Sequence, residues 1–274
     1  MIDCKKYVTE RLENLKKYVT EHSLSNKELA VIQIGDDAAS NSYIKGKKAD
    51  CAFVGIKMRH IKFPETVGLL GVISEIAILN EDEDVLGIIV QLPIPKHLDE
   101  ELILNAIADA KDVDGFKATS PFEPCTPKGV LSILEDIDYD VEGKTVCVIG
   151  KGKTVGMPLV PMLMKKGATV ISCNSKTNRI ILDNLLQYSH IVISAVGRPN
   201  LIKLYDFIDR YSRYDFIPDV IIDVGISRDE NGKLCGDVDK ELSEWVDLMT
   251  PVPGGVGLYT RVSLLENTIY GGAK

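Results

Sequence analysis

Hydrophobic positions near the start of the chain recur with helical spacing. Leu12, Leu15 and Val19 are separated by three and four residues. That spacing places them on one face and predicts an amphipathic helix over residues 4–22.

Short apolar runs then alternate with helical patterns through the first half of the chain. In chain order, the pattern predicts strand 29–34, helix 40–54, strand 56–63, helix 66–80 and strand 85–91. Strands that alternate with helices indicate a parallel sheet.

The alternation stops in a polar, proline-containing stretch at residues 111–127 and resumes in the second half. A helix is predicted to start after Thr126, as N-cap, with Pro127 at its first position. After a charged connection at residues 138–144, the strands are dense in Val and Ile, which is typical of strands buried on both faces. They are predicted at residues 145–149, 168–173, 190–195 and 217–225, with a last helix at about residues 261–271.

The pattern therefore predicts two α/β domains, the second a Rossmann-like, doubly wound parallel sheet. The first is expected to span residues 1–140, with the C-terminal helix, about residues 261–274, packing back on it. The second is expected to span residues 141–260. A chain of 274 residues is long enough for two such domains and a cleft between them.

Composition narrows the possible function classes. The chain is 45% hydrophobic and 26% charged, as expected of a soluble globular protein, with a net charge of -8 and a pI of about 5.2. The acidic balance argues against nucleic acid as a partner, because nucleic-acid-binding proteins present a basic face. The negative net charge is still compatible with a local basic pocket that binds an anionic small molecule.

The cysteines and histidines indicate neither a disulfide framework nor a metal site. The six cysteines are scattered and contain no Cys-x-x-Cys pair, which favours a reducing compartment. The four histidines show no metal-ligand spacing, so no metal is expected. The start of the chain lacks a signal-peptide pattern, and no apolar run is long enough to cross a membrane, so we expect a cytoplasmic protein with no membrane partner.

A glycine-rich turn joins the predicted strand 145–149 to a helix. Gly150, Gly152 and Gly156 form a Gly-x-Gly-x-x-x-Gly pattern, one residue wider than the usual dinucleotide fingerprint. Such glycines let the backbone approach a pyrophosphate at a helix N-terminus. The pattern predicts a dinucleotide site; the alternative is a turn that serves only the strand-to-helix geometry.

The expected dinucleotide is NADP. An NAD enzyme usually carries Asp or Glu after the second strand of such a unit, where residues 172–177 contain no acid. Ser175 and Lys176, together with Lys151 in the turn, suit the 2′-phosphate of NADP. NAD stays an alternative, since either lysine could be an ordinary exposed residue.

Polar residues of the first half are candidates for chemistry. Tyr43 and Lys47 lie four residues apart on one helix face, where desolvation and a phenol can tune an amine, although such a pair can also be surface decoration. Gln91 ends a predicted strand, where sites form in parallel sheets. Asp112 and Asp114 lie in a polar turn and could bind the N–H groups of a heterocycle or cap the turn.

Residues 251–257 read Pro-Val-Pro-Gly-Gly-Val-Gly. The segment is stiff at its prolines and permissive at its glycines, so it could bring backbone close to a nicotinamide ring.

Five segments together make residues 35–268 resemble one enzyme family. They are Tyr43–Lys47, Val90–Pro95, Lys111–Phe116, Pro124–Pro127 and Pro251–Gly257. Their order and placement resemble the methylenetetrahydrofolate dehydrogenase/methenyltetrahydrofolate cyclohydrolase family, which has two α/β domains with a cleft and is usually dimeric. The resemblance implies a homodimeric enzyme of one-carbon folate metabolism that acts on tetrahydrofolate derivatives. It would oxidise 5,10-methylenetetrahydrofolate with NADP and hydrolyse the methenyl product to 10-formyltetrahydrofolate.

The resemblance also implies roles for individual residues. Lys47 would be the general acid/base, Tyr43 would position it and contact the folate, and Gln91 would keep it poised. Asp114 would anchor the pterin-like ring. Substrate binding would further involve Pro253, Gly254 and Gly255, and cofactor binding Gly150, Lys151, Gly152, Thr154, Val155, Gly156, Ser175, Lys176 and Ile226.

Three segments depart from the family pattern. Residues 150–152 read Gly-Lys-Gly instead of Gly-Arg-Ser, which keeps a charge but loses the bidentate fork of arginine. The loop between Phe116 and Pro124 is shorter, and residues 258–260 read Leu-Tyr-Thr instead of Pro-Met-Thr in a segment expected to line the cleft. A cyclohydrolase with weak or NAD-shifted dehydrogenase activity is therefore one alternative. A non-catalytic dinucleotide-binding regulator and an unrelated NADP dehydrogenase are the others.

Overall fold

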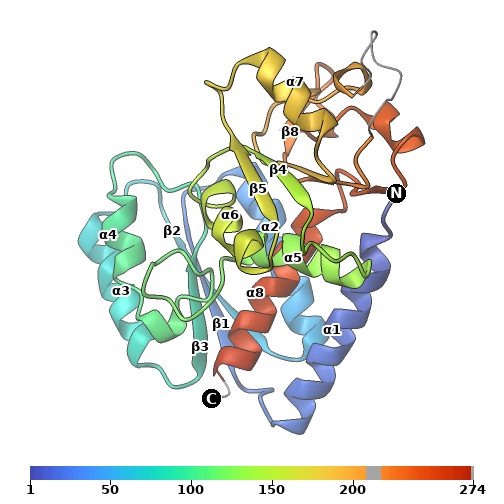
Figure 1. Ribbon diagram of the computed structural model, residues 1–274. Helices are drawn as coiled ribbons and strands as arrows, with labels where there is room; N and C mark the ends of the chain where they lie inside the picture. The colour runs from blue at the N-terminus through green and yellow to red at the C-terminus, as the bar shows by residue number, and fades with distance from the viewer. Residues whose placement is uncertain (208–216, 273–274) are drawn as a thin grey trace. The chain divides into compact units, whose positions relative to one another are not determined.

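The computed structural model describes residues 1–207 and 217–272, which form two compact α/β units (Figure 1). The three-stranded unit comprises Thr9–Cys125 and the residues from Arg261 on, and the five-stranded unit comprises Met1–Val8 and Thr126–Thr260. Residues 273 and 274 of the expected last helix lie outside the described residues.

The three-stranded unit is built on a parallel sheet. Its strands are β1 (Glu28–Ile34), β2 (Lys57–Phe63) and β3 (Val85–Val90), in the order β2-β1-β3. The chain therefore passes from β1 to β2 on one side and then crosses to β3 on the other side of β1. This reversal makes the carboxyl ends of β1 and β3 a topological switch point, the place where ligands bind in open α/β sheets. The prediction of a parallel sheet is confirmed here.

Helices cover this sheet. They are α2 (Ala38–Val54), α3 (Leu69–Glu81) and α4 (Glu100–Asn105), followed by a 3-10 turn, η1 (Asp109–Lys111). Figure 1 shows α3 and α4 together on one side of the strands. The buried side chains of Ile32 and Ile88 pack there with Ile76 of α3 and Ile103 of α4, and burial of this apolar area stabilises the sheet and fixes its register.

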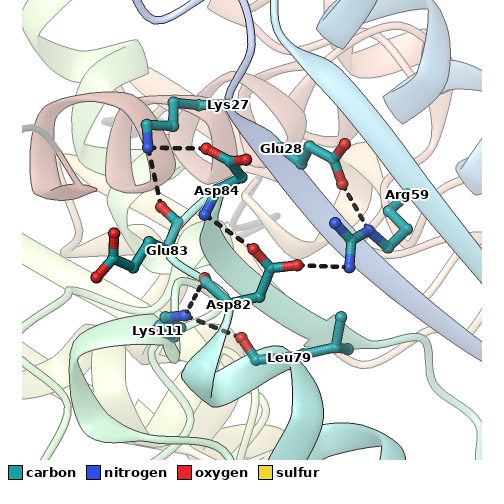
Figure 2. Close-up of polar contacts among 8 residues, drawn as sticks. All are labelled: Lys27, Glu28, Arg59, Leu79, Asp82, Glu83, Asp84 and Lys111. Atoms are coloured by element: carbon teal, nitrogen blue, oxygen red, sulfur yellow. Dashed lines mark hydrogen bonds and ion pairs between the residues drawn. The ribbon is translucent and has the colours of Figure 1, made fainter.

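Ion pairs tie together the amino-terminal edge of the same sheet (Figure 2). The Arg59 Nε lies 2.6 Å from the Glu28 Oε2, and its Nη1 lies 2.8 Å from the Asp82 Oδ2. The Lys111 Nζ donates to the carbonyl oxygens of Leu79 and Asp82 at 2.9 and 2.7 Å, which satisfies acceptors left free at the end of α3. Lys111 therefore has a structural role at the amino-terminal edge of the sheet. Gln91 lies at the opposite, carboxyl-terminal edge, directly after β3.

The five-stranded unit contains a second parallel sheet. Its strands are β4 (Thr145–Ile149), β5 (Thr169–Cys173), β6 (Ile191–Ser194), β7 (Val220–Asp223) and β10 (Leu248–Met249), in the order β10-β7-β6-β4-β5. The chain runs from β4 to the edge strand β5 and then crosses to β6 on the other side of β4. The switch point of this doubly wound sheet therefore lies at the end of β4, where the glycine-rich turn begins.

Short elements complete the five-stranded unit. They are α6 (Gly156–Lys165), α7 (Arg179–Gln187), η2 (Leu204–Asp206), η3 (Lys240–Glu244) and an antiparallel hairpin of β8 (Ser227–Arg228) and β9 (Leu234–Cys235). Leu182 and Leu186 of α7 pack in one core with Val192 of β6 and Ile221 of β7. On α6, Leu159 and Leu163 are fully buried.

Three helices carry residues of both units, and two of them begin earlier than predicted. They are α1 (Cys4–Glu21), α5 (Cys125–Asp136) and α8 (Val256–Gly272). Because α5 begins at Cys125, Thr126 is not its N-cap; Pro127 is tolerated there because the first-turn N–H groups have no intrahelical partner. Helix α8 begins before residue 261, where Gly257, a weak helix former, concealed the helical pattern.

Candidate active site

Lys47 and Gln91 meet in the three-stranded unit. Lys47 lies on α2, which follows β1, and Gln91 directly follows β3. The Lys47 Nζ donates to the Gln91 Oε1 at 2.9 Å, and both side chains are half-buried. The crossover connection of a 2-1-3 sheet brings these segments to the same carboxyl-terminal edge.

The backbone around Gln91 fixes the direction of its amide. Its N–H donates to the Ile32 carbonyl at 2.8 Å, and its Nε2 donates to the Leu92 carbonyl at 2.9 Å. With the amide nitrogen held by a carbonyl, only the amide oxygen can face the amine. Gln91 is therefore preset to accept a hydrogen bond from the Lys47 amine.

Asp112 and Asp114 have different roles although they share one polar turn. Asp112 is buried and caps the turn, since its Oδ2 accepts the Lys117 N–H at 2.9 Å. Asp114 is half-buried, and its carboxyl acts electrostatically on Lys47, opposing the lowering of the Lys47 pKa by burial. The structure thus selects Asp114, and not Asp112, as the carboxylate beside the amine.

Helix α8 holds the loop that carries Asp114. The Nδ2 of the buried Asn267 donates to the carbonyl oxygens of Val113 and Glu123, at 2.9 and 3.0 Å. The Cys125 thiol donates to the Val113 carbonyl at 3.2 Å. Sequence reasoning missed Asn267 and left Cys125 without a role, because neither belongs to a motif whose chemistry is legible on its own.

The electrostatics of this cluster favour a neutral amine. Burial lowers the pKa of Lys47, and the nearby Asp114 carboxyl only partly opposes that shift. Burial likewise raises the pKa of Asp114, against the influence of Lys47. For both groups desolvation outweighs their mutual attraction, so Lys47 can act as a base at a lower pH than a free lysine can.

Tyr43 lies one turn before Lys47 on the same face of α2. Its ring is half-buried, and burial raises the pKa of its hydroxyl, with Arg261 of α8 opposing the rise. The phenol therefore stays protonated at neutral pH, available as a hydrogen-bond donor and as an aromatic surface. Tyr43, Lys47, Gln91 and Asp114 are all brought together within one unit.

The glycine-rich turn of the five-stranded unit fits a dinucleotide. A Cβ at Gly156 would stand 1.8 Å from the Gly150 carbonyl oxygen, whereas a Cβ at Gly152 would meet no protein atom within 4 Å. The N-cap residue of α6, Val155, offers no side-chain cap. The turn is thus closed on its inner side, open on its outer side, and followed by an uncapped helix end that suits a pyrophosphate.

The residues expected to bind the 2′-phosphate of NADP lie in two loops that follow neighbouring strands. Lys151, Ser175 and Lys176 belong to the turn after β4 and the loop after β5, and both lysines are exposed. A hydrogen bond from Cys147 lowers the pKa of the Cys173 thiol, and the charge of Lys151 contributes to that shift. Lys151 is therefore within electrostatic reach of the carboxyl end of β5, the strand end that reads the ribose in such folds.

Two exposed apolar side chains follow the neighbouring strands. Val196, after β6, and Ile226, after β7, are 46% and 49% exposed. Exposed apolar residues at the carboxyl ends of adjacent strands offer a surface for a planar ring of a cofactor. Ile226 was expected from the sequence, whereas Val196, at the end of the neighbouring strand, was missed.

A buried carboxylate orders the loop that carries Val196. Asp237 is fully buried, and its Oδ2 accepts the Ser194 hydroxyl at 2.7 Å and the Val196 N–H at 2.8 Å, while its Oδ1 accepts the Arg198 N–H at 2.6 Å. Three such charge-assisted bonds hold the loop in one conformation. No motif in the sequence marks Asp237, since its partners come from a distant segment.

The Pro-Gly segment before α8 has mixed roles. Pro253 is exposed, Gly254 has a φ of +102° that favours glycine, and Gly255 packs against the Pro251 carbonyl. Tyr259, expected on a substrate-facing segment, is instead fully buried, and its hydroxyl donates to the Asp136 Oδ2 at 2.7 Å. Gly129 of α5 lets the backbone of α8 come close at this residue, since a Cβ at Gly129 would stand 3.0 Å from the Tyr259 Cβ.

Within residues 1–207 and 217–272, no three His, Cys, Asp or Glu side chains gather where they could hold a metal ion. In the same described ranges, no helix is both long and apolar enough to span a membrane.

Two family models match the chain. The catalytic domain of tetrahydrofolate dehydrogenase/cyclohydrolase matches residues 2–114, and the NAD(P)-binding domain of tetrahydrofolate dehydrogenase/cyclohydrolase matches residues 124–273. The matches separate the segment with Lys47 and Asp114 from the segment with the glycine-rich turn.

Known proteins are similar to the chain over most of its length. A bifunctional protein FolD of Bacillus cytotoxicus is 43% identical over 251 residues, which cover 88% of this chain and 84% of that protein. The structure of the bifunctional FolD methylenetetrahydrofolate dehydrogenase/cyclohydrolase from Campylobacter jejuni has 38% identity and a TM-score of 0.89, covering 98% of this chain and 97% of that one. The Trypanosoma brucei N5,N10-methylenetetrahydrofolate dehydrogenase-cyclohydrolase, complexed with NADP cofactor and inhibitor, has 28% identity and a TM-score of 0.90, covering 99% and 96%.

Proposed function

The chain belongs to the tetrahydrofolate dehydrogenase/cyclohydrolase family, and from that premise we propose that it is a bifunctional enzyme of one-carbon folate metabolism. It oxidises 5,10-methylenetetrahydrofolate to 5,10-methenyltetrahydrofolate with NADP and hydrolyses that product to 10-formyltetrahydrofolate. The observation that carries the proposal is the half-buried Lys47, whose amine donates a hydrogen bond to the Gln91 Oε1 at 2.9 Å. Burial lowers the pKa of this amine.

Lys47 accounts for the hydrolytic half of the reaction. The methenyl carbon is an electrophilic amidinium, so it needs a base that activates water more than it needs further polarisation. Neutral Lys47 takes a proton from the attacking water, and a C–O bond forms at the methenyl carbon. The resulting ammonium returns the proton to N5 as the C–N5 bond breaks, while loss of the hydroxyl proton leaves a formyl group on N10.

The other residues of the cluster position the reactants. Gln91 holds the amine through its amide oxygen, which accepts from either protonation state of lysine. The Asp114 carboxyl supplies an acceptor for ring N–H groups, and such bonds would stabilise its ionised form. Tyr43 offers an aromatic face and a hydroxyl on the same side of α2, and we assign Pro253, Gly254 and Gly255 to substrate contacts.

NADP, when bound, accepts a hydride from the methylene carbon. The chain's own task in this step is to hold the dinucleotide in a fixed place, since hydride transfer depends on alignment. We assign the pyrophosphate to the open side of the turn and the N-terminus of α6, and a ring to Val196 and Ile226. The residues proposed to contact NADP are Gly150, Lys151, Gly152, Thr154, Val155, Gly156, Ser175, Lys176 and Ile226.

We propose a functional division near residue 140. Folate binding is assigned to residues 1–140 with the C-terminal helix, and NADP binding to residues 141–260. Lys47, Gln91 and Asp114 lie in the first range, and the glycine-rich turn lies in the second. A chain cut back to residues 141–260 that retained NADP binding would support this division, and loss of binding from a folded fragment would contradict it.

The absorbance of methenyltetrahydrofolate tests the function directly. With methylenetetrahydrofolate and NADP, its ultraviolet band should appear; with methenyltetrahydrofolate alone, the band should decay. Decay without appearance would identify a cyclohydrolase whose dehydrogenase activity is weak, and a band that appears better with NAD would identify a shifted preference. No change in either assay would leave a dinucleotide-binding regulator or an unrelated dehydrogenase.

Replacing Lys151 with alanine should weaken NADP more than NAD. The exposed amine would pair with the 2′-phosphate, which NAD lacks, so we expect about a tenfold rise in the Kd for NADP and little change for NAD. Fluorescence titration of both dinucleotides measures this. Lys153→Ala, an exposed lysine of the same turn, is the control. Equal weakening of NADP and NAD would show that Lys151 does not contact the 2′-phosphate.

We also propose a homodimer formed through the five-stranded unit. Strand β5 is an edge of the sheet with Val170 and Ile171 partly exposed, and the adjacent α6 exposes Met157 and Met164. An apolar, unpaired edge can serve a symmetric contact with a second copy. Sedimentation should give a dimer mass that Met164→Lys, a change at an exposed residue of α6, reduces to a monomer; a monomeric wild type would overturn the proposal.

A cytoplasmic location is the last part of the proposal. None of the six cysteines, all of which lie among the described residues, forms a disulfide, and five of them are buried. Cysteines without disulfides in this number are typical of a reducing compartment. Recovery of the protein from a membrane or extracellular fraction of its own cells would contradict the assignment.

A further inference from the structure

Arg261 of α8 lies against the helix that carries Lys47. Its Nε donates to the Asp50 Oδ2 at 2.6 Å, and the two side chains are 23% and 12% exposed. Gly46 makes room for the guanidinium, since a Cβ there would stand 2.3 Å from the Arg261 Nη1 and 2.9 Å from its Cζ. The guanidinium therefore rests on α2 at the residue that precedes Lys47.

The face of α2 explains why this charge stays in place. Tyr43, Lys47 and Asp50 recur at helical spacing, so they follow one another along one side of the helix. Burial raises the pKa of Asp50, and the paired Arg261 opposes that rise. A carboxylate held in this way fixes the guanidinium through a charge-assisted hydrogen bond. Because Arg261 pairs with Asp50, the Gln91 amide oxygen remains the acceptor for the Lys47 amine.

We propose that Arg261 is a positioning residue for the hydrolysis, a fixed positive charge beside Lys47 that favours the neutral, basic form of its amine. The proposal rests on the assigned role of Lys47. Four groups influence the pKa of this amine through their charge: Asp114 in its loop, Cys125 on α5, Cys51 on α2 and Arg261 on α8. Burial raises the pKa of Cys51 to about 12 and also raises that of Asp114, so of the four groups Arg261 alone is charged at every pH.

The pH profile of hydrolysis tests this role. In Arg261→Met, which keeps the apolar stem and removes the charge, the acid limb of kcat should move up by about one pH unit. The rate below the limb should therefore fall about tenfold, and the rate on the alkaline plateau should match the wild type. Arg261→Lys should restore most of the limb position, because it keeps the charge.

A second variant moves the charge without removing it. Gly46→Ala adds a methyl group where the guanidinium lies, and alanine favours the helix, so the protein should stay folded while the Arg261 head group is displaced. Its acid limb should move in the same direction as that of Arg261→Met. The control is Arg11→Met, which also removes an ion pair to α8, with Glu266 at 3.0 Å, and should leave the limb where it is.

A measurement that needs no turnover separates this proposal from the assignment of Lys47. The rate at which trinitrobenzenesulfonate modifies Lys47, followed by peptide mass spectrometry across pH, reports the proton on the amine directly. In Arg261→Met, the midpoint pH of Lys47 modification should rise together with the acid limb of kcat. An unchanged midpoint, or a raised KM with an unchanged limb, would overturn the role of Arg261 and mark it as a structural or substrate-contacting residue. Failure of the Lys47 assignment would appear elsewhere, as hydrolysis that survives Lys47→Met.

Discussion

Replacing Lys47 with methionine is expected to lower the rate of methenyltetrahydrofolate hydrolysis by a factor of about 10² to 10⁴, the range that a general acid–base group contributes. Methionine keeps the length of the side chain and its packing but cannot take a proton from water. The dinucleotide turn belongs to the other unit, so the Kd for NADP should stay within about twofold. Decay of the methenyl band and fluorescence titration measure the two effects.

The same substitution should not unfold the protein. Burial makes the pKa of Lys47 lower in the folded state than in the unfolded state. At any pH between these two pKa values the unfolded state binds more protons, so the free energy of unfolding rises with pH over that range. At neutral pH the buried amine is thus a cost, and methionine removes it. The melting temperature at neutral pH is expected to hold or to rise.

A neighbouring lysine provides the control. Lys45→Met changes an exposed lysine on the same helix and should leave hydrolysis at the wild-type rate. A Lys47→Met protein that hydrolyses methenyltetrahydrofolate as fast as Lys45→Met would remove Lys47 from the mechanism. The cluster of Gln91 and Asp114 would then have to be assigned to substrate binding alone.

The regular elements were predictable because their periods are local. The apolar runs that became β1, β3 and β4 and the helical spacing of α1 each lie within one short window of sequence. Helix α4, strand β10 and the β8–β9 hairpin were missed, since elements of two to six residues show too few periods to stand out. The start of α8 was missed because tertiary packing of the buried Tyr259 overrides the weak helix propensity of Gly257.

The candidate site divides in a similar way. Lys47, Gln91 and Asp114 could be proposed because each belongs to a segment with recognisable chemistry, and the 2-1-3 strand order explains why Lys47 and Gln91 meet. The polar turn alone could not tell Asp112 from Asp114, and only the family resemblance singled out Asp114, since burial and hydrogen bonds decide between a turn cap and a site carboxylate. Arg261 and Asn267 were not predictable, because their partners on α2 and in the Asp114 loop are far away in sequence and meet them only in the folded unit.

Replacing Gly156 with alanine is expected to cost the five-stranded unit about 3 kcal/mol, the upper end of ordinary overpacking. The new Cβ would stand 1.8 Å from the Gly150 oxygen and 2.8 Å from its carbonyl carbon, and both atoms belong to backbone that cannot rotate away. The turn would have to open, so the melting temperature should drop by roughly 10 °C and the affinity for NADP by about 100-fold. Hydrolysis by the other unit should persist below the new melting temperature.

Gly152→Ala separates the ligand's requirement from that of the fold. No protein atom lies within 4 Å of a Cβ at Gly152, so the variant should melt like the wild type. If a pyrophosphate approaches the open side of the turn, the same methyl group would block it, and the affinity for NADP should fall about tenfold. A contrary result would be unchanged NADP binding in Gly152→Ala together with a Gly156→Ala protein that loses only stability. In that case the glycines would serve only the geometry of the turn between β4 and α6. The dinucleotide would then have to bind elsewhere, because a turn that tolerates a side chain on its open face is not in contact with phosphate.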